Sequence, residues 1–150
     1  MDINFKPAEK KHLNIALKMM HDFHAIDEYP FDENIIKSLF LSFINNESSG
    51  RFWLIDIDKE IAGYIVLAFG FSFEYLGRDA FIDEFYIEEK FRNQGVGQRA
   101  LDFVFKEAKA LNIKMLHLEL ERHNMSGHHL YLKNGFKDNN RYLLNKVLIN

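Results

Sequence analysis

The chain has 150 residues, of which 47% are hydrophobic and 27% charged, and its formal net charge is −3. This length fits one domain, which we expect to span residues 1–150. The mild negative charge excludes nucleic acid and anionic membranes as the main partner of this protein. The absence of cysteine excludes disulfides, thiolate zinc sites and a cysteine nucleophile. The sequence shows neither a signal peptide nor an apolar run as long as a membrane span, so we expect a cytoplasmic protein.

The first half of the chain predicts a strand, two helices and a long hairpin. Residues 3–5 predict a short first strand. Apolar residues recur at helical spacing over residues 8–23, and Asp32 is placed to cap a second helix. The period then changes, and residues 51–58 and 60–75 predict two strands joined by a tight turn.

The second half alternates strands with helices. Residues 80–87 predict a strand, 95–111 an amphipathic helix, 114–121 a half-buried strand and 124–133 a short helix. From residue 136 onward the pattern predicts one or two last strands. The order of these segments predicts an α/β (α+β) fold, with a central mixed, mostly antiparallel sheet of about six to seven strands flanked by about four helices.

One glycine-rich stretch has the features of an anion-binding site. Residues 90–97, Lys-Phe-Arg-Asn-Gln-Gly-Val-Gly, follow a predicted strand and open the amphipathic helix. Gly95 and Gly97 let main-chain N–H groups approach an anion without side chains in the way. The positive end of the helix dipole adds to this attraction. The stretch therefore predicts a place to hold a pyrophosphate.

Other interpretations of the glycines remain. A dinucleotide-binding protein would use residues 95–100 as G-x-G-x-x-A, with Glu119 or Glu121 holding the ribose of NAD. That motif places its first glycine directly after a buried strand, whereas here the polar run 88–94 intervenes. A Walker-type phosphate loop is excluded because no Gly-Lys-Ser/Thr follows. The glycines could also form a turn that only starts a helix.

Two blocks of the sequence resemble the GNAT superfamily of N-acetyltransferases. Arg92-x-x-Gly95-x-Gly97 resembles its acyl-coenzyme-A signature, R/Q-x-x-G-x-G/A. Downstream, residues 124–136 resemble its second block, N-x-x-A-x-x-L-Y-x-x-x-G-F, with Gly127 in place of the usual alanine. The two blocks occur in the family's order, with one helix and one strand between them.

This resemblance implies a GNAT fold, a homodimer, and direct transfer of an acetyl group from acetyl-CoA to a primary amine, with coenzyme A as product. Residues 82–87 are similar to the acidic and then aromatic strand of the spermidine/spermine acetyltransferase-like branch. By resemblance, main-chain groups of residues 94–98 hold the pyrophosphate and those of residues 85–87 pair with the pantetheine. Arg92 either contacts phosphate or pairs with an acid on the surface. The implied cofactor-binding residues are Phe85, Tyr86, Ile87, Arg92, Asn93, Gln94, Gly95, Val96, Gly97, Gln98 and Asn124.

Acetyl transfer needs a neutral amine, and an alkyl amine with a pKa near 10.4 is almost wholly protonated at neutral pH. A base is therefore useful, and Glu84, mid-strand beside the expected thioester, is our candidate. Strand alternation places Asp83 on the opposite face as a cation-binding group, unless a bulge re-aims it. Both acids could instead be solvated or paired with Arg78. By resemblance, Tyr131 protonates the departing thiolate, whereas otherwise it is an aromatic residue at the edge of the core. Asn124 could hydrogen-bond near the pantetheine, cap its helix, or do both.

The sequence does not identify the acceptor. Asp27, Glu28 and Tyr29, with Asp83 and Glu84, could line an acidic, aromatic mouth that favours small cationic amines such as polyamines or amino sugars. A protein amine is the other acceptor left open. The histidines lack the spacing of metal ligands, so we expect no metal site. A non-catalytic acyl-CoA-binding module with the same fold is the alternative function.

Overall fold

The computed structural model describes residues 1–149, which form two compact units divided after Glu119. The first unit, Met1–Glu119, contains a five-stranded sheet with the strand order β1-β2-β3-β4-β5. Strands β1 to β4 pair in antiparallel fashion, and β5 pairs parallel to β4. The strands are β1 (Ile3–Pro7), β2 (Gly50–Ile57), β3 (Glu60–Ser72), β4 (Gly77–Ile87) and β5 (Met115–His117).

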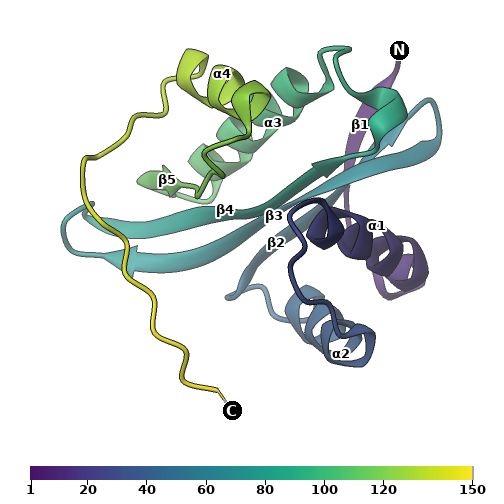
Figure 1. Cartoon of the computed structure of the whole chain (residues 1–150), viewed down its shortest axis with the longest axis horizontal. Helices are drawn as coiled ribbons and strands as arrows, with labels where there is room; N and C mark the ends of the chain where they lie inside the picture. Colours follow the sequence, from purple (N-terminus) through teal and green to yellow (C-terminus); the bar gives the residue numbers. More distant parts are fainter. Residues whose placement is uncertain (150) are drawn as a thin grey trace. The chain divides into compact units, whose positions relative to one another are not determined.

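Helices cover both faces of this sheet (Figure 1). α1 (Leu13–Ile26), which follows the short 3₁₀ turn η1 (Lys10–His12), and α2 (Glu33–Ile44) pack on one face. α3 (Val96–Ala110) packs on the other face, and the 3₁₀ turn η2 (Glu89–Phe91) precedes it in the chain. The predicted cap of α2 is confirmed, because Asp32 Oδ1 accepts a hydrogen bond of 3.1 Å from the Ile35 amide.

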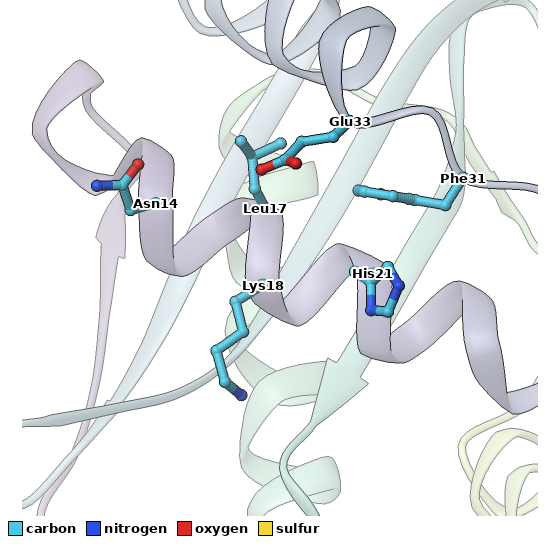
Figure 2. Close-up of a pocket in the computed structure, with 6 residues that line it drawn as sticks. All are labelled: Asn14, Leu17, Lys18, His21, Phe31 and Glu33. Atoms are coloured by element: carbon cyan, nitrogen blue, oxygen red, sulfur yellow. The ribbon is translucent and has the colours of Figure 1, made fainter.

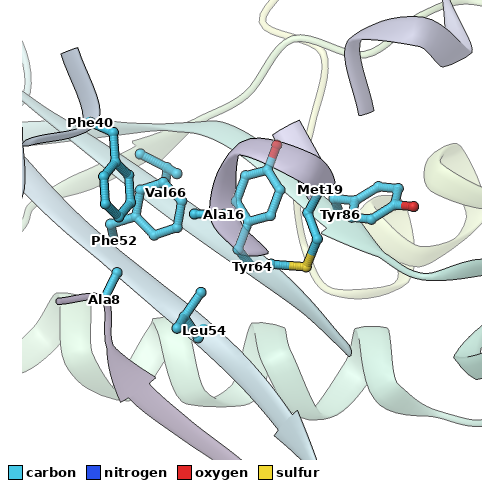
Figure 3. Packing of buried hydrophobic residues seen from close by; sticks show 9 residues of the cluster. All are labelled: Ala8, Ala16, Met19, Phe40, Phe52, Leu54, Tyr64, Val66 and Tyr86. Carbon is cyan, nitrogen blue, oxygen red and sulfur yellow. The ribbon is translucent and has the colours of Figure 1, made fainter. Parts of the chain in front are cut away.

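The core has one apolar layer on each side of the sheet. On the α1 and α2 side, Met19 and Phe40 pack with Phe52 and Tyr64 from the central strands (Figure 3). The rings of Phe52 and Tyr64 stack with centroids 5.2 Å apart. On the other side, Val96 and Ala100 of α3 pack against isoleucines of β1 and β2. Burying a side chain of this size contributes about 1.5–3 kcal/mol, so these two layers fix the sheet and its helices as one body.

β4 contains a β-bulge at Asp83. Leu67 and Val66 are adjacent on β3, yet they pair with Ile82 and Glu84, so Asp83 is an extra residue on β4. The extra residue shifts the alternation of side chains by one position. Glu84 therefore lies on the face that packs against α1.

The second unit, from Leu120 onward, contains α4 (Met125–Lys133). The Asn124 side chain caps this helix by accepting a hydrogen bond of 3.0 Å from the Gly127 amide. Gly135 has a φ of +89°, as expected for a glycine that follows a helix end. Residues 136–149 form neither helix nor strand, and the side chains of Tyr142 and Leu144 are 97% and 87% exposed.

The structure corrects two sequence predictions. The α+β class, the mixed sheet and four helices are confirmed over the described residues, but the sheet there has five strands, so the prediction of six to seven was wrong. The strands predicted after Phe136 do not form because the chain there pairs with no sheet edge. The strand predicted over residues 114–121 is only Met115–His117, since its pairing with β4 ends at Phe81, two residues before the bulge. Within residues 1–149, no helix has the length and apolar composition needed to cross a bilayer.

Candidate active site

One edge of β4 is open beside the bulge. In the described part of the chain, β5 pairs with β4 at only three positions, Asp79, Ala80 and Phe81. β4 nevertheless continues to Ile87, and its other edge pairs with β3 as far as that residue. The main chain of residues 82–87 therefore presents one edge without a neighbouring β5 residue, next to Glu84. This edge contains the predicted residues Phe85, Tyr86 and Ile87.

The N-terminus of α3 follows this edge in the chain. Gly95 is the N-cap residue, its φ is +81°, and it has no side chain with which to cap the helix. The first N–H groups of a helix have no partner within the helix, so those at the start of α3 point toward an anion that approaches its end. The side chains of Gln94 and Gln98 bond instead to Lys90 O at 2.7 Å and Asp102 Oδ1 at 3.0 Å. Glycine suits the N-cap here because the left-handed φ strains other residues.

Arg92 and Asn93 shape the turn between β4 and α3. Arg92 Nε donates a hydrogen bond of 2.8 Å to Ile87 O, and its guanidinium carbon lies 5.6 Å from the centre of the Tyr86 ring. Asn93 adopts a φ of +59°, which asparagine tolerates better than most residues. Arg92 thus links the end of β4 to the turn, an interaction that neither of the two sequence-based alternatives included.

Glu84 is at the centre of a hydrogen-bond network. Tyr64 Oη donates to Glu84 Oε1 at 2.7 Å, and His24 Nε2 lies 2.7 Å from Glu84 Oε2. His24 belongs to the last turn of α1, and its Nδ1 lies 3.3 Å from Pro30 O. Three segments distant in sequence, α1, β3 and β4, therefore meet at one carboxyl group.

Burial dominates the electrostatics of this network. It raises the pKa of Glu84 above its ordinary value, although the hydrogen bonds from Tyr64 and His24 act in the opposite direction. Burial, followed by the charge of Glu84, raises the pKa of Tyr64 well above its usual range, so Tyr64 stays a hydroxyl donor. The pKa of Asp83 is also raised by desolvation and is lowered to a smaller extent by His24. Two carboxyl groups that protonate more readily than usual thus occupy neighbouring positions on β4.

The predicted acceptor loop lies next to this network. The Tyr29 amide donates a hydrogen bond of 2.9 Å to His24 O, and Tyr29 is 54% exposed. Glu28 adopts a φ of +58° in the turn that follows α1. The turn containing Glu28 and Tyr29 is therefore bonded to the main chain of His24, the residue whose side chain contacts Glu84.

Tyr131 and Asn124 belong to the second unit. Burial raises the pKa of Tyr131 to about 12, so its hydroxyl keeps its proton throughout the neutral range. Its ring packs edge-on against Phe136, with centroids 5.6 Å apart. The side chain of Asn124 accepts the capping hydrogen bond described above, which is one of its two predicted roles.

Sequence reasoning missed His24 and Tyr64. Both carried a weak signal, since His24 continues the inward helical spacing of Leu13, Leu17 and Met20, and Tyr64 lies within a predicted strand. Neither signal predicts that these two side chains bond to Glu84. Across residues 1–149, no group of three or more His, Cys, Asp or Glu side chains is arranged to hold a metal ion.

A separate groove of about 550 Å³ lies between α1 and the start of α2. Figure 2 shows His21 and Phe31 at one end of the groove and Asn14 at the other. Leu17, Lys18 and Glu33 complete the lining. None of these six residues is among the predicted site residues, and Phe31 connects the groove to the network around Glu84 by packing against His24.

Comparison with known proteins decides the family. The model of the acetyltransferase (GNAT) family matches residues 16–136, which include the β4 edge, the start of α3 and Tyr131. The chain belongs to the acetyltransferase (GNAT) family. It is therefore a GNAT-type N-acetyltransferase, and its acetyl donor is acetyl-CoA.

Solved structures agree with the GNAT fold. An integron cassette protein from the mobile metagenome of Cole Harbour Salt Marsh is 27% identical, with a TM-score of 0.86 over 97% of this chain and 91% of its own. A predicted acetyltransferase from Clostridium acetobutylicum, solved with acetyl-CoA, is 23% identical, with a TM-score of 0.80 over 98% and 97%. The aminoglycoside 6'-N-acetyltransferase of Acinetobacter baumannii is 15% identical, with a TM-score of 0.79 over 99% and 100%. A search of curated protein sequences finds no match.

Proposed function

We propose that this GNAT acetyltransferase transfers the acetyl group directly from acetyl-CoA to the primary amine of a small cationic molecule, similar to a polyamine or an amino sugar. The observation that carries the proposal is the stretch of β4 that pairs with no β5 residue in the described part of the chain, because it contains Glu84 and leads to the glycine N-cap of α3. A protein amine is the second class of acceptor, and a homodimer is part of the proposal through the family resemblance.

The donor side of the proposal uses main-chain groups. The open edge at residues 85–87 would pair with the amide groups of the pantetheine, as a neighbouring strand does. The N–H groups of Val96, Gly97 and Gln98 would receive the pyrophosphate. Among the described residues β5 does not pair with residues 85–87, which supports the first interaction, and the glycine N-cap at Gly95, with its left-handed φ, supports the second.

Glu84 is the proposed base. The ammonium group of the acceptor gives a proton to the Glu84 carboxylate, and the electron pair of the broken N–H bond stays on nitrogen for attack on the thioester carbonyl. A raised pKa improves Glu84 for this step, because the ideal base titrates near the working pH. Asp83, Glu28 and Tyr29 are proposed to attract and orient the cation.

Tyr131 is the proposed acid. When the tetrahedral intermediate collapses, the nitrogen loses its second proton to solvent, the carbon–sulfur bond breaks, and the thiolate takes the phenolic proton of Tyr131. The high pKa of this side chain supports the role, because Tyr131 enters the reaction fully protonated. Solvent then returns a proton to Tyr131 and removes one from Glu84.

The proposal is tested by following the release of coenzyme A thiol from acetyl-CoA with a panel of primary amines. We expect turnover with diamines, triamines or amino sugars, and little turnover with neutral or anionic amines. Turnover only with peptides bearing a free amine would identify a protein acceptor instead. Equal turnover of cationic and anionic amines would contradict the proposed role of Asp83 and Glu28.

A further inference from the structure

His24 has the contacts of a residue that controls the charge on Glu84. Its Nδ1 lies 3.3 Å from the carbonyl oxygen of Pro30, and a carbonyl only accepts hydrogen bonds. Nδ1 must therefore carry a proton to bond there. Its Nε2 lies 2.7 Å from Glu84 Oε2, a distance typical of a charge-assisted hydrogen bond. If Glu84 is a carboxylate, Nε2 must carry a proton too.

The surroundings hold the imidazole in this orientation. Phe31 and Phe23 lie against His24 at 82° and 70°, with ring centroids 5.4 Å and 5.9 Å away. Only 17% of the His24 side chain and 15% of the Glu84 side chain are exposed, so water screens the pair poorly. The other titratable groups acting on Glu84 are Tyr64, which stays a neutral donor, and the neighbouring Asp83.

We propose that His24 is a positioning residue which, as an imidazolium protonated at both nitrogens, ties the Pro30 segment to Glu84 and keeps Glu84 an anion. This inference rests on the proposed function, in which Glu84 accepts the proton of the amine. The remaining lone pairs of the Glu84 oxygens receive that proton, while Tyr64 and His24 hold the carboxylate in place. His24 itself does not contact the acceptor or the thioester in this scheme.

The first test measures charge without activity. Nitrogen-15 NMR of the histidine rings at pH 7 should show both nitrogens of His24 protonated in the wild-type protein. In Glu84→Gln, which replaces the anion by a neutral amide, His24 should become singly protonated at the same pH. A singly protonated His24 in the wild-type protein would overturn the proposal, whatever reaction the enzyme catalyses.

The second test measures the pH profile of kcat/KM. Without the positive charge and the donor, the Glu84 anion is less favoured, so the acidic limb should move to higher pH. We expect a move of about one pH unit or more for His24→Leu, a smaller move for His24→Gln, and a plateau at high pH close to that of the wild type. Identical acidic limbs in all three proteins would also overturn the proposal.

His21→Gln is the matched control. His21 lies one turn earlier on α1 and also packs against Phe31, at 5.3 Å, but its ion-pair neighbour is Asp22. This variant should leave the acidic limb where it is, and circular dichroism would show that all variants are folded. If the wild-type protein acetylates no amine, the proposed function fails while the NMR measurement still decides the charge of His24.

Discussion

At the scale of single residues, burial and hydrogen bonding act on Glu84 in opposite directions. Burial raises its pKa, whereas Tyr64 and His24 lower it, and burial prevails. A carboxyl whose pKa is raised on folding contributes stability fully below its unfolded pKa, and this contribution is lost as the pH rises through the folded pKa. At neutral pH the ionised Glu84 therefore costs stability, which is expected of a group retained for chemistry.

We predict opposite effects of Glu84→Gln on activity and stability. Loss of the base should lower kcat/KM by about 10²- to 10⁴-fold, and the acidic limb of the wild-type profile should disappear. The melting temperature at pH 7 should be equal to or higher than that of the wild type, because a neutral amide replaces a carboxylate that burial disfavours. Steady-state kinetics and calorimetry check the two parts, and a wild-type rate for the variant would remove Glu84 from the reaction.

Tyr131→Phe should lower kcat by about ten- to a thousandfold and leave the affinity for acetyl-CoA nearly constant. The reason is that the phenolic proton is needed only as the thiolate departs, so the change removes a transition-state interaction. Stopped-flow kinetics and calorimetric titration of the same sample measure the two quantities. Unchanged turnover would exclude Tyr131 as the acid.

The sequence predicted part of this chemistry. It names Glu84 and Tyr131 as candidates, because Glu84 lies mid-strand beside the expected thioester and Tyr131 lies in a family block. The partners of Glu84 could not be found in that way, since His24 and Glu84 are 60 residues apart and meet only after α1 packs on the sheet. Local spacing indicates which residues face inward, but it does not tell which of them touch.

At the scale of elements, the start of α3 determines donor binding in our proposal. Gly97→Val adds a branched side chain in the first turn of this helix, and we expect weaker binding of coenzyme A because the main chain can no longer approach the phosphates. Calorimetric titration gives the change in Kd. Lys106→Val, an exposed position of the same helix, controls for the lower helix propensity of valine. Equal Kd values for the two variants would place the pyrophosphate elsewhere.

The cap of α2 gives a prediction about stability alone. Asp32→Ala removes the hydrogen bond to the Ile35 amide and should lower the free energy of unfolding by about 1 kcal/mol. Asp32→Asn keeps an acceptor at the same position and should lose much less. Urea denaturation measures both values. Equal losses for alanine and asparagine would show that the side-chain acceptor does not matter.

At the scale of the whole molecule, ligand binding should appear as thermal stabilisation. Acetyl-CoA at a hundredfold excess over its Kd adds about 2.7 kcal/mol to the folded state, or about 5–10 °C in the melting temperature of a chain of this size. NAD at the same concentration should give no shift, because the glycines follow a polar turn and not a buried strand. A shift with NAD alone would favour the dinucleotide interpretation.

Strand number was the main error in predicting the fold. Residues 142–144 and 147–149 are apolar runs, but a strand forms only beside another strand, and residues 136–149 pair with none. Elements that derive stability from an amphipathic face, such as α2 and α3, were predicted well. The length of β5 was overestimated because β5 ends where its pairing with β4 ends, at Phe81. The sequence of β5 itself does not indicate that position.

Because of the bulge at Asp83, the face of the sheet on which Glu84 lies depends on the number of residues in β4. Removing Asp83 would restore strict alternation and leave Glu84 opposite Val66, on the same side of the sheet as Tyr64 and His24. Removing Ile82 together with Asp83 would place Glu84 opposite Leu67 and turn its carboxyl to the α3 side. The facing of Glu84 therefore survives the loss of the one extra residue, whereas the loss of a second residue reverses it.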